Sequence, residues 1–232
     1  MIIISLANEV VFMKQTSQWL VRTIFVVYMI YIYFFVYRVN SFYSFLLLNT
    51  FLAYIPIELA MHMHSKQNRW VFWLFFLLWA LFYPNAPYLL TDLYHLARVN
   101  PYDPQTNLMM FRFDLWKNFA DLVLAALGCT LMGMWSLDYV AHLVAIRLHQ
   151  PSRLFCYSLV AIFNFFSAIG VFIGRFLRLH SIYLIFEPQW ALQKIAQMWD
   201  LKALIFIVSF FIIQMAVWIC MEIYRHSLQQ FN

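Results

Sequence analysis

Charged residues are scarce in this chain. Asp, Glu, Lys and Arg make up 11% of its 232 residues, whereas an average soluble domain carries about 25%. A water-soluble fold of this size could not cover its surface with so few charges. Several apolar runs also reach the roughly 20 residues that an α-helix needs to cross a bilayer, and they are continuous, which disfavours a β-barrel. The sequence therefore predicts an all-α, polytopic membrane protein.

Sequence motifs of soluble enzymes and metal sites are also lacking. The chain contains no G-x-S-x-G, P-loop or dinucleotide fingerprint and no H-E-x-x-H. Its three cysteines, Cys129, Cys156 and Cys220, show no C-x-x-C spacing and are expected to be buried, inert thiols. We therefore predict no cofactor and no metal.

Basic residues give a net charge of +5, but they are spread over nearly every loop. A nucleic-acid footprint would need a basic stripe, so nucleic acid is not an expected partner. Membrane lipids are the expected partners, a partner protein is possible, and the oligomeric state stays open. Lys and Arg also divide almost evenly between the two sides of the membrane, so the orientation stays open as well.

The hydrophobic runs predict a single integral membrane domain over residues 1–232. We expect six spans, at about residues 19–37, 42–61, 70–96, 118–137, 154–176 and 201–224. Residues 189–200 are expected to form a helix in the membrane interface, since their apolar side chains fall near one face.

The third span is interrupted by two prolines, Pro84 and Pro87. Proline lacks an amide N–H and pushes the residue before it out of the helical region, so we expect the helix to break. Residues 70–82 are about 20 Å long as a helix, which is short of the roughly 30 Å hydrocarbon core. The second piece must complete the crossing or lie in the interface. We expect Asn85 to be its N-cap, with amide groups that could hold an anion, as in transporters.

On this second piece, Tyr88, Asp92 and His95 recur at positions i, i+4 and i+7 and share one face. Such a face predicts a ligand site inside the membrane. The alternative is an interfacial helix whose Asp92 and His95 face lipid headgroups.

Two more polar stretches are expected on the same side of the membrane, because the ends of odd-numbered spans meet the starts of even-numbered ones. Asp114 and Asp121, near the start of the fourth span, are either solvated near a helix N-terminus or face the third span. Arg175 and Arg178, at the end of the fifth span, either reach lipid phosphates, pair with Asp92 or Asp114, or bind an anionic group through their planar guanidinium groups. The predicted binding cluster comprises Asn85, Tyr88, Asp92, His95, Asp114, Asp121, Arg175 and Arg178.

Two blocks of sequence resemble an uncharacterised bacterial membrane family, the domain of unknown function 1361. The first is Tyr-Pro-Asn-Ala-Pro-Tyr-Leu-Leu-Thr-Asp-Leu-Tyr-His-Leu at 83–96, and the second is Gly-Arg-Phe-Leu-Arg at 174–178. Asn49, Tyr54-Ile-Pro56 and Phe113-Asp114 fit more loosely. The family often continues with Trp-Asn-Ser-Trp-Asp, of which only Ser181 is kept here, and Tyr183 replaces the acid.

The resemblance covers most of residues 45–190. It implies a multi-span protein of the bacterial cytoplasmic (inner) membrane, and it brings no established activity.

Three functional classes remain open. The broken helix and the intramembrane acids favour small-solute or ion binding and transport. An enzyme acting on lipid or envelope precursors is the second class. A base and headgroup clamps for it could come from Asp92, His95, Asp114, Arg175 and Arg178. A structural or accessory protein with a satisfied polar network is the third.

Overall fold

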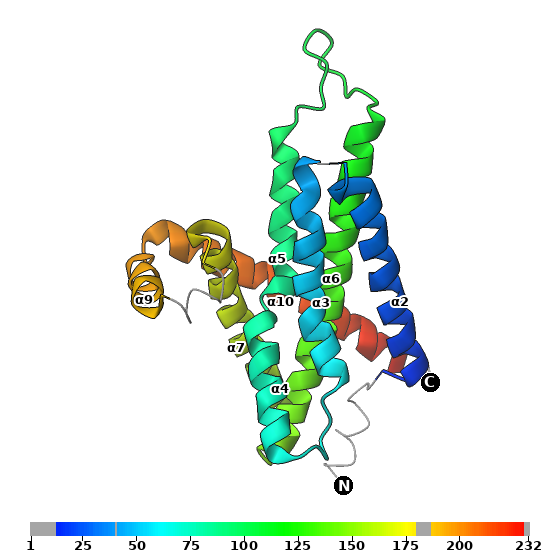
Figure 1. Ribbon diagram of the computed structural model, residues 1–232. Coiled ribbons are helices and arrows are strands. Elements are labelled where there is room, and N and C mark those ends of the chain that lie inside the picture. The colour runs from blue at the N-terminus through cyan, green and yellow to red at the C-terminus, as the bar shows by residue number, and fades with distance from the viewer. Residues whose placement is uncertain (1–12, 40, 180–186, 230–232) are drawn as a thin grey trace.

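The computed structural model describes residues 13–39, 41–179 and 187–229, which are mostly helical, with one long connection, residues 99–112, projecting from an end of the bundle (Figure 1). The α-helices are α2 (Gln15–Ile32), α3 (Phe45–Met61), α4 (Arg69–Phe82), α5 (Asn85–Asp92), α6 (Phe113–Arg147), α7 (Arg153–Phe172), α9 (Pro188–Gln197) and α10 (Leu201–Gln229). Four short turns adjoin them: the 3-10 helices η2 (Phe42–Ser44) and η3 (Leu93–Arg98), and the π-helices η1 (Tyr33–Tyr37) and η4 (Ile173–Leu177).

Six helical segments are long and apolar enough to cross a membrane, and each coincides with one of the predicted spans. They are Gln15–Tyr37, Phe42–Met61, Arg69–Arg98, Phe113–Arg147, Arg153–Leu177 and Leu201–Ser227. The prediction of an all-α, multi-pass bundle is confirmed, and within the described residues the only β-type pairing is a single bridge between Tyr102 and Met109.

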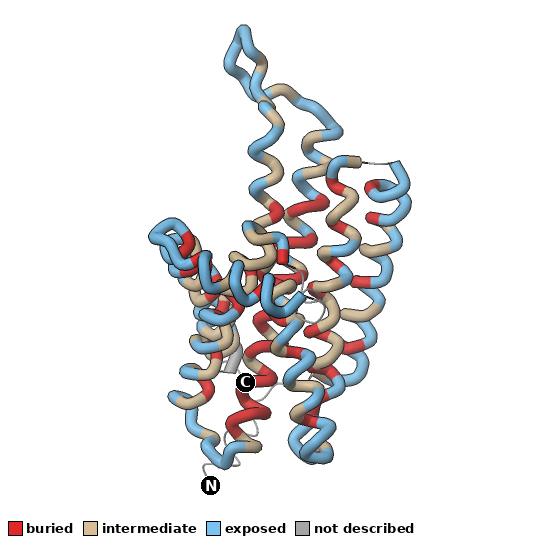
Figure 2. The backbone as a smooth tube through the Cα atoms, turned by 60° about the vertical axis from the view of Figure 1, so that its left-hand side comes forward, coloured by how far each residue is buried: buried red, intermediate tan, exposed pale blue. Residues whose placement is uncertain are grey.

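The central helix of the bundle is α6, which contacts α3, α5, α7 and α10 (Figure 1). It extends beyond the predicted 118–137 at both ends. The helix does not end at the predicted boundary of the span: the next residue, Asp138, stays helical, and its carboxylate pairs with Arg225 of α10. Figure 2 shows buried residues along the inward faces of the helices and exposed residues along the outward ones. Cys220 lies on an outward face of α10 and is exposed, contrary to expectation, while Cys129 and Cys156 are buried.

The third span is interrupted at Tyr83 and Pro84, between α4 and α5. The interruption is confirmed, but it is tighter than predicted, because both residues keep right-handed helical dihedrals. The Tyr83 amide still donates to the Trp79 carbonyl at 2.7 Å, and the Ala86 amide donates to the Tyr83 carbonyl at 3.0 Å. The chain therefore kinks without unwinding, and α5 continues the crossing that α4 begins.

Small residues on the neighbouring helices allow this kink to pack closely. A Cβ atom at Gly133 of α6 would lie 2.5 Å from the Ala86 Cβ, and one at Gly170 of α7 would lie 3.0 Å from the Pro84 Cγ. One turn later, a Cβ at Gly174 would lie 3.5 Å from the Tyr88 ring. The Gly170-x-x-x-Gly174 motif therefore serves helix packing, with the interrupted span as its partner.

The fifth span ends in the π-helical turn η4. The amide of Arg178 donates to the carbonyl of Ile173, five residues back, and Arg178 itself has the left-handed dihedral angle φ of 52°. A π-turn holds one residue more than an α-turn and changes the direction in which the side chains point. The turn η4 contains Arg175, the residue that reaches the third span.

Candidate functional site

An ion pair joins the third span to the fifth. The guanidinium of Arg175 donates from Nη1 to Asp92 Oδ1 at 2.8 Å. The Asp92 side chain is 1% exposed and that of Arg175 is 18% exposed. Asp92 therefore faces the interior of the bundle and not lipid headgroups, and the expectation that Arg175 reaches lipid phosphates was wrong. The competing expectation, pairing of Arg175 with an acid, is what the structure shows.

Both partners of this ion pair make further hydrogen bonds. Asn49 of α3 donates from Nδ2 to Asp92 Oδ2 at 2.7 Å. Arg175 donates from Nη2 to the backbone carbonyl of Thr91 at 2.9 Å, and its Nη1 lies 3.4 Å from the Tyr88 hydroxyl. A buried carboxylate is costly unless it is paired and hydrogen-bonded, and here both of its oxygens have a donor.

His95 adds a group that can hold a proton in two places. Its Nδ1 lies 3.1 Å from Arg175 Nη2 and 3.0 Å from the backbone carbonyl of Asp92. A guanidinium can only donate and a carbonyl can only accept, so Nδ1 satisfies one neighbour or the other, according to the tautomer. The imidazole also packs on the ring of Phe45, with centroids 4.5 Å apart.

A cavity of about 500 Å³ lies beside the interruption. Its polar lining residues are Asn49, Asn85 and Tyr88, and its other lining residues are Leu52, Ala80, Leu81, Phe82, Pro84, Gly170, Ile173, Gly174, Leu179 and Ile195. Ligand pockets in proteins have volumes of about 300–1,000 Å³ and are mostly apolar with a few polar groups. The cavity fits that description, and α3, α4, α5, α7, η4 and α9 all contribute to it.

Asn85 occupies a different role from the one predicted. Its side chain does not cap α5, because Nδ2 donates backwards to the Phe82 carbonyl at 2.9 Å, near the end of α4. The first turn of α5 also contains Pro87, which has no amide hydrogen. The expected open set of amide donors for an anion is therefore not formed here.

The remaining predicted residues lie apart from the ion pair. Asp114 is exposed and pairs with Arg112 at 2.6 Å. Asp121 is buried, two turns into α6, and pairs with Lys117 at 2.9 Å, so it is neither solvated nor in the first turn as expected. Its Oδ1 also accepts from the Tyr31 hydroxyl at 3.0 Å.

Arg178 is exposed and forms no ion pair within the described ranges. Five of the eight predicted residues therefore form the ion pair or lie around it and its cavity: Asn85, Tyr88, Asp92, His95 and Arg175. Within the described residues, no three His, Cys, Asp or Glu side chains lie close enough together to hold a metal ion.

Sequence reasoning missed two polar groups. Asn49 was noted only as a loose family match, yet it connects Asp92 with the cavity. A second charged cluster joins α6 to α10, where Arg225 pairs with both Asp138 and Glu222, and Glu222 accepts from the Tyr157 hydroxyl at 2.7 Å. The acids inside apolar runs were the available signal for this cluster.

A buried polar contact also supports the kink from the side of α7. The hydroxyl of Tyr83 donates to Asn164 Oδ1 at 2.9 Å, and both side chains are buried. The amide of Gln214 in α10 donates to the Asn164 backbone carbonyl at 3.2 Å. The fifth span therefore holds the interrupted span at two levels, with a neutral contact at Tyr83 and a charged one at Asp92.

Comparison with known proteins shows the family of this chain. Residues 48–217 match the family described as "Protein of unknown function (DUF1361)". The chain belongs to the DUF1361 family. No curated protein and no solved structure matches it. In this DUF1361 protein the two blocks that carried the resemblance, 83–96 and 174–178, meet at the Asp92–Arg175 pair. The positions that depart from the family pattern lie outside the described residues, except for Leu179.

Proposed function

We propose that this protein binds a small, mainly neutral solute in the cavity beside the interrupted span and carries it across a bacterial cytoplasmic membrane. The observation that carries the proposal is the double role of Asn49 and Tyr88. Both line the cavity, and both contact the buried ion pair. The bacterial membrane rests on the resemblance to a bacterial family.

A ligand in this cavity would reach two of the side chains that contact the ion pair. If a solute oxygen displaces Asp92 from the Asn49 amide hydrogen that Asp92 accepts, that hydrogen is withdrawn from Asp92. The Asp92 carboxylate then keeps Arg175 as its main partner. Each such exchange involves a charge-assisted hydrogen bond worth about 1.5–3 kcal/mol, which is enough to shift an equilibrium between two arrangements of the bundle.

The lining restricts the class of solute. The charged side chains Asp92 and Arg175 are not among the lining residues of the cavity. Its polar groups are the carboxamides of Asn49 and Asn85 and the phenol of Tyr88, and the rest of the lining is apolar. Because an inorganic ion would lack charged ligands here, the geometry favours a neutral molecule with hydroxyl or amide groups and some apolar surface.

Native mass spectrometry of the gently purified protein tests the proposal. We compare the wild type with Asp92→Asn, which alters the network, and Ala80→Phe, which fills the cavity from its wall. Leu127→Phe is the control, since Leu127 lies on an outward face of α6 and is 52% exposed.

We expect a retained small molecule in the wild type and in the control, and its loss from the other two variants. Its mass then identifies the solute for flux measurements in liposomes. A bare mass in every sample would contradict the proposal and favour an accessory protein with a purely structural network. Conversion of the retained molecule into a product in detergent would instead favour an enzyme.

A further inference from the structure

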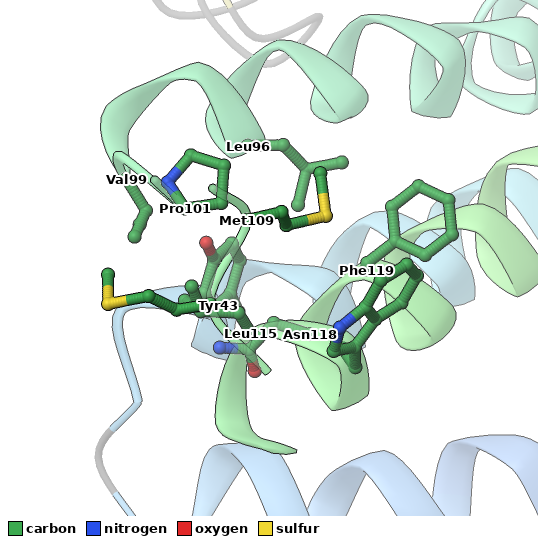
Figure 3. A pocket seen from close by; sticks show the side chains of 10 residues that line it. Tyr43, Leu96, Val99, Pro101, Met109, Leu115, Asn118 and Phe119 are labelled. Carbon is green, nitrogen blue, oxygen red and sulfur yellow. The ribbon is translucent and has the colours of Figure 1, made fainter. Parts of the chain in front are cut away.

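A second cavity, of about 220 Å³, lies where the third span ends and the fourth begins. Figure 3 shows side chains from three segments surrounding it: Tyr43 from η2, Leu96 from the end of η3, and Leu115 and Phe119 from the first turns of α6. The connection between η3 and α6 covers it with Pro101 and Met109. Most of the lining is apolar, and none of the lining residues is charged.

This cavity opens among exposed apolar side chains. Of its lining residues, Trp116 is 46% exposed, Phe119 is 44% exposed and Met109 is 54% exposed, whereas Tyr43 at the opposite wall is only 6% exposed. Exposed aromatic residues at the ends of spans are typical of the depth at which hydrocarbon chains meet headgroups. The mouth of the cavity therefore faces the region of the bilayer in which acyl chains begin.

An exposed arginine lies in the same turn of chain as two lining residues of this cavity. Arg98 lies between Leu96 and Val99, which both line the cavity, and its guanidinium lies 4.2 Å from the ring centroid of Phe42. No acid within the described residues pairs with Arg98, whereas Arg112 and Lys117 nearby are paired with Asp114 and Asp121. Stacking on Phe42 leaves the edge of the guanidinium open, and this edge matches two oxygens of a phosphate.

We infer that this cavity is a binding site for an anionic phospholipid, with part of one acyl chain inside it and the phosphate against Arg98. An apolar chamber and an unpaired cation at the membrane edge match the two ends of such a molecule. A peptide segment would need partners for its backbone N–H and C=O groups, and the side chains of the lining offer few: the Tyr43 hydroxyl, the Asn118 amide and the Trp116 indole N–H.

Titration with defined lipids, followed by native mass spectrometry, tests this inference. The probes are phosphatidylglycerol, which is anionic, and phosphatidylcholine, which carries no net charge. We expect the wild type to bind phosphatidylglycerol more tightly. Arg98→Gln should weaken that binding by about fivefold, the effect of one cation near the bilayer surface. It should weaken phosphatidylcholine less, because the choline cation of that lipid already balances the charge of its phosphate.

Matched controls separate a site from general surface attraction. Arg38→Gln removes another exposed arginine, at the end of η1, and should leave the binding of both lipids unchanged. Leu115→Trp fills the cavity and should weaken both lipids, whereas Leu108→Trp, at the exposed part of the same connection, should weaken neither. Arg98→Gln is a surface change and keeps the fold, so it tests the inference even if Leu115→Trp does not fold.

Equal effects of Arg38→Gln and Arg98→Gln, or unchanged binding in Leu115→Trp, would overturn the inference. So would a protein partner that is lost from Leu115→Trp while no lipid preference is seen. These results do not depend on the solute cavity, which lies beside the interruption of the third span.

Discussion

Arg175 and Asp92, 83 residues apart in the chain, approach to 2.8 Å and join the end of the fifth span to the end of α5. Burying an ion pair costs desolvation energy, and a well-packed apolar pair of similar volume is often at least as stable. The pair therefore does more to select one arrangement of the two spans than to add net stability. That distinction can be measured.

Arg175→Gln should destabilise the protein by about 3–5 kcal/mol, because it leaves the Asp92 carboxylate buried and unpaired. The double variant Asp92→Asn/Arg175→Gln should recover much of that loss, since it leaves no buried charge. Thermal unfolding in detergent measures both. Losses that simply add in the double variant would show that the two side chains act independently.

Three of the four glycines differ in how closely a new Cβ atom would approach its neighbours. Gly133→Ala should destabilise by about 1–3 kcal/mol, because its Cβ would lie 2.5 Å from Ala86 and force a backbone shift. Gly128→Ala, with nothing within 4 Å of the new Cβ, should instead stabilise by about 0.5–1 kcal/mol through helix propensity.

Gly174→Ala, with ordinary contact at 3.5 Å to Tyr88, should fall between these two. Melting temperatures measured under one set of conditions rank the three variants. If Gly133→Ala melted at or above the wild-type temperature, α6 and α5 would not pack as closely as described.

A carrier must open its cavity to water on one side of the membrane. We expect Leu52→Cys, on the cavity wall, to react with a membrane-impermeant maleimide added to one side of cells. The background carries Ala at Cys129, Cys156 and Cys220, so that no native thiol contributes. Leu127→Cys, on an outward face, is the control and should stay unlabelled. Labelling of Leu52→Cys from neither side would leave a sealed cavity and count against transport.

Asp103 organises the exposed connection between η3 and α6. Its Oδ1 accepts the amides of Thr106 at 2.9 Å and Gln105 at 2.8 Å, and these hydrogen bonds lower the pKa of the carboxyl below its ordinary value. The turn is thus fully stabilised at neutral pH, and this contribution is lost as the pH falls through the lowered pKa.

Carboxyl ¹³C NMR, with Asp103→Asn to assign the resonance, should give a midpoint below the usual value of about 3.9 for aspartate. A midpoint at or above that value would mean that the carboxylate does not hold the turn.

The spans could be predicted because they rest on local signals. Continuous apolar runs and paired prolines act through the residues that carry them, and alternation of crossings places Asp92 and Arg175 on one side. Pairing of Arg175 with an acid of that side was an expectation from topology. Which acid it would choose depended on the distance between helices, and that distance is set by Gly170 and Gly174.

What sequence reasoning missed depends on contacts between distant segments. Asn49 stands in an apolar helix with no neighbouring motif, and only Asp92 gives it a role. Asp138 lies just beyond the predicted end of the fourth span, and its partner Arg225 comes from another helix, so the sequence around Asp138 does not reveal the pair. Asn85 is a favourable N-cap residue type with Pro87 in the turn that follows it, but the chain stays helical there and its side chain turns back to Phe82.

The direction in which the Arg175 side chain points depends on the π-helical turn η4, which follows α7. If residues 173–177 relaxed into an ordinary α-helix, the turn would hold one residue fewer. The side chains beyond it would then rotate by about 100° around the helix axis. Arg175 would then leave Asp92 while α7 kept its place against α10. A twist within this single turn would therefore be enough to uncouple the third span from the fifth, with no hinge and no displacement of a helix.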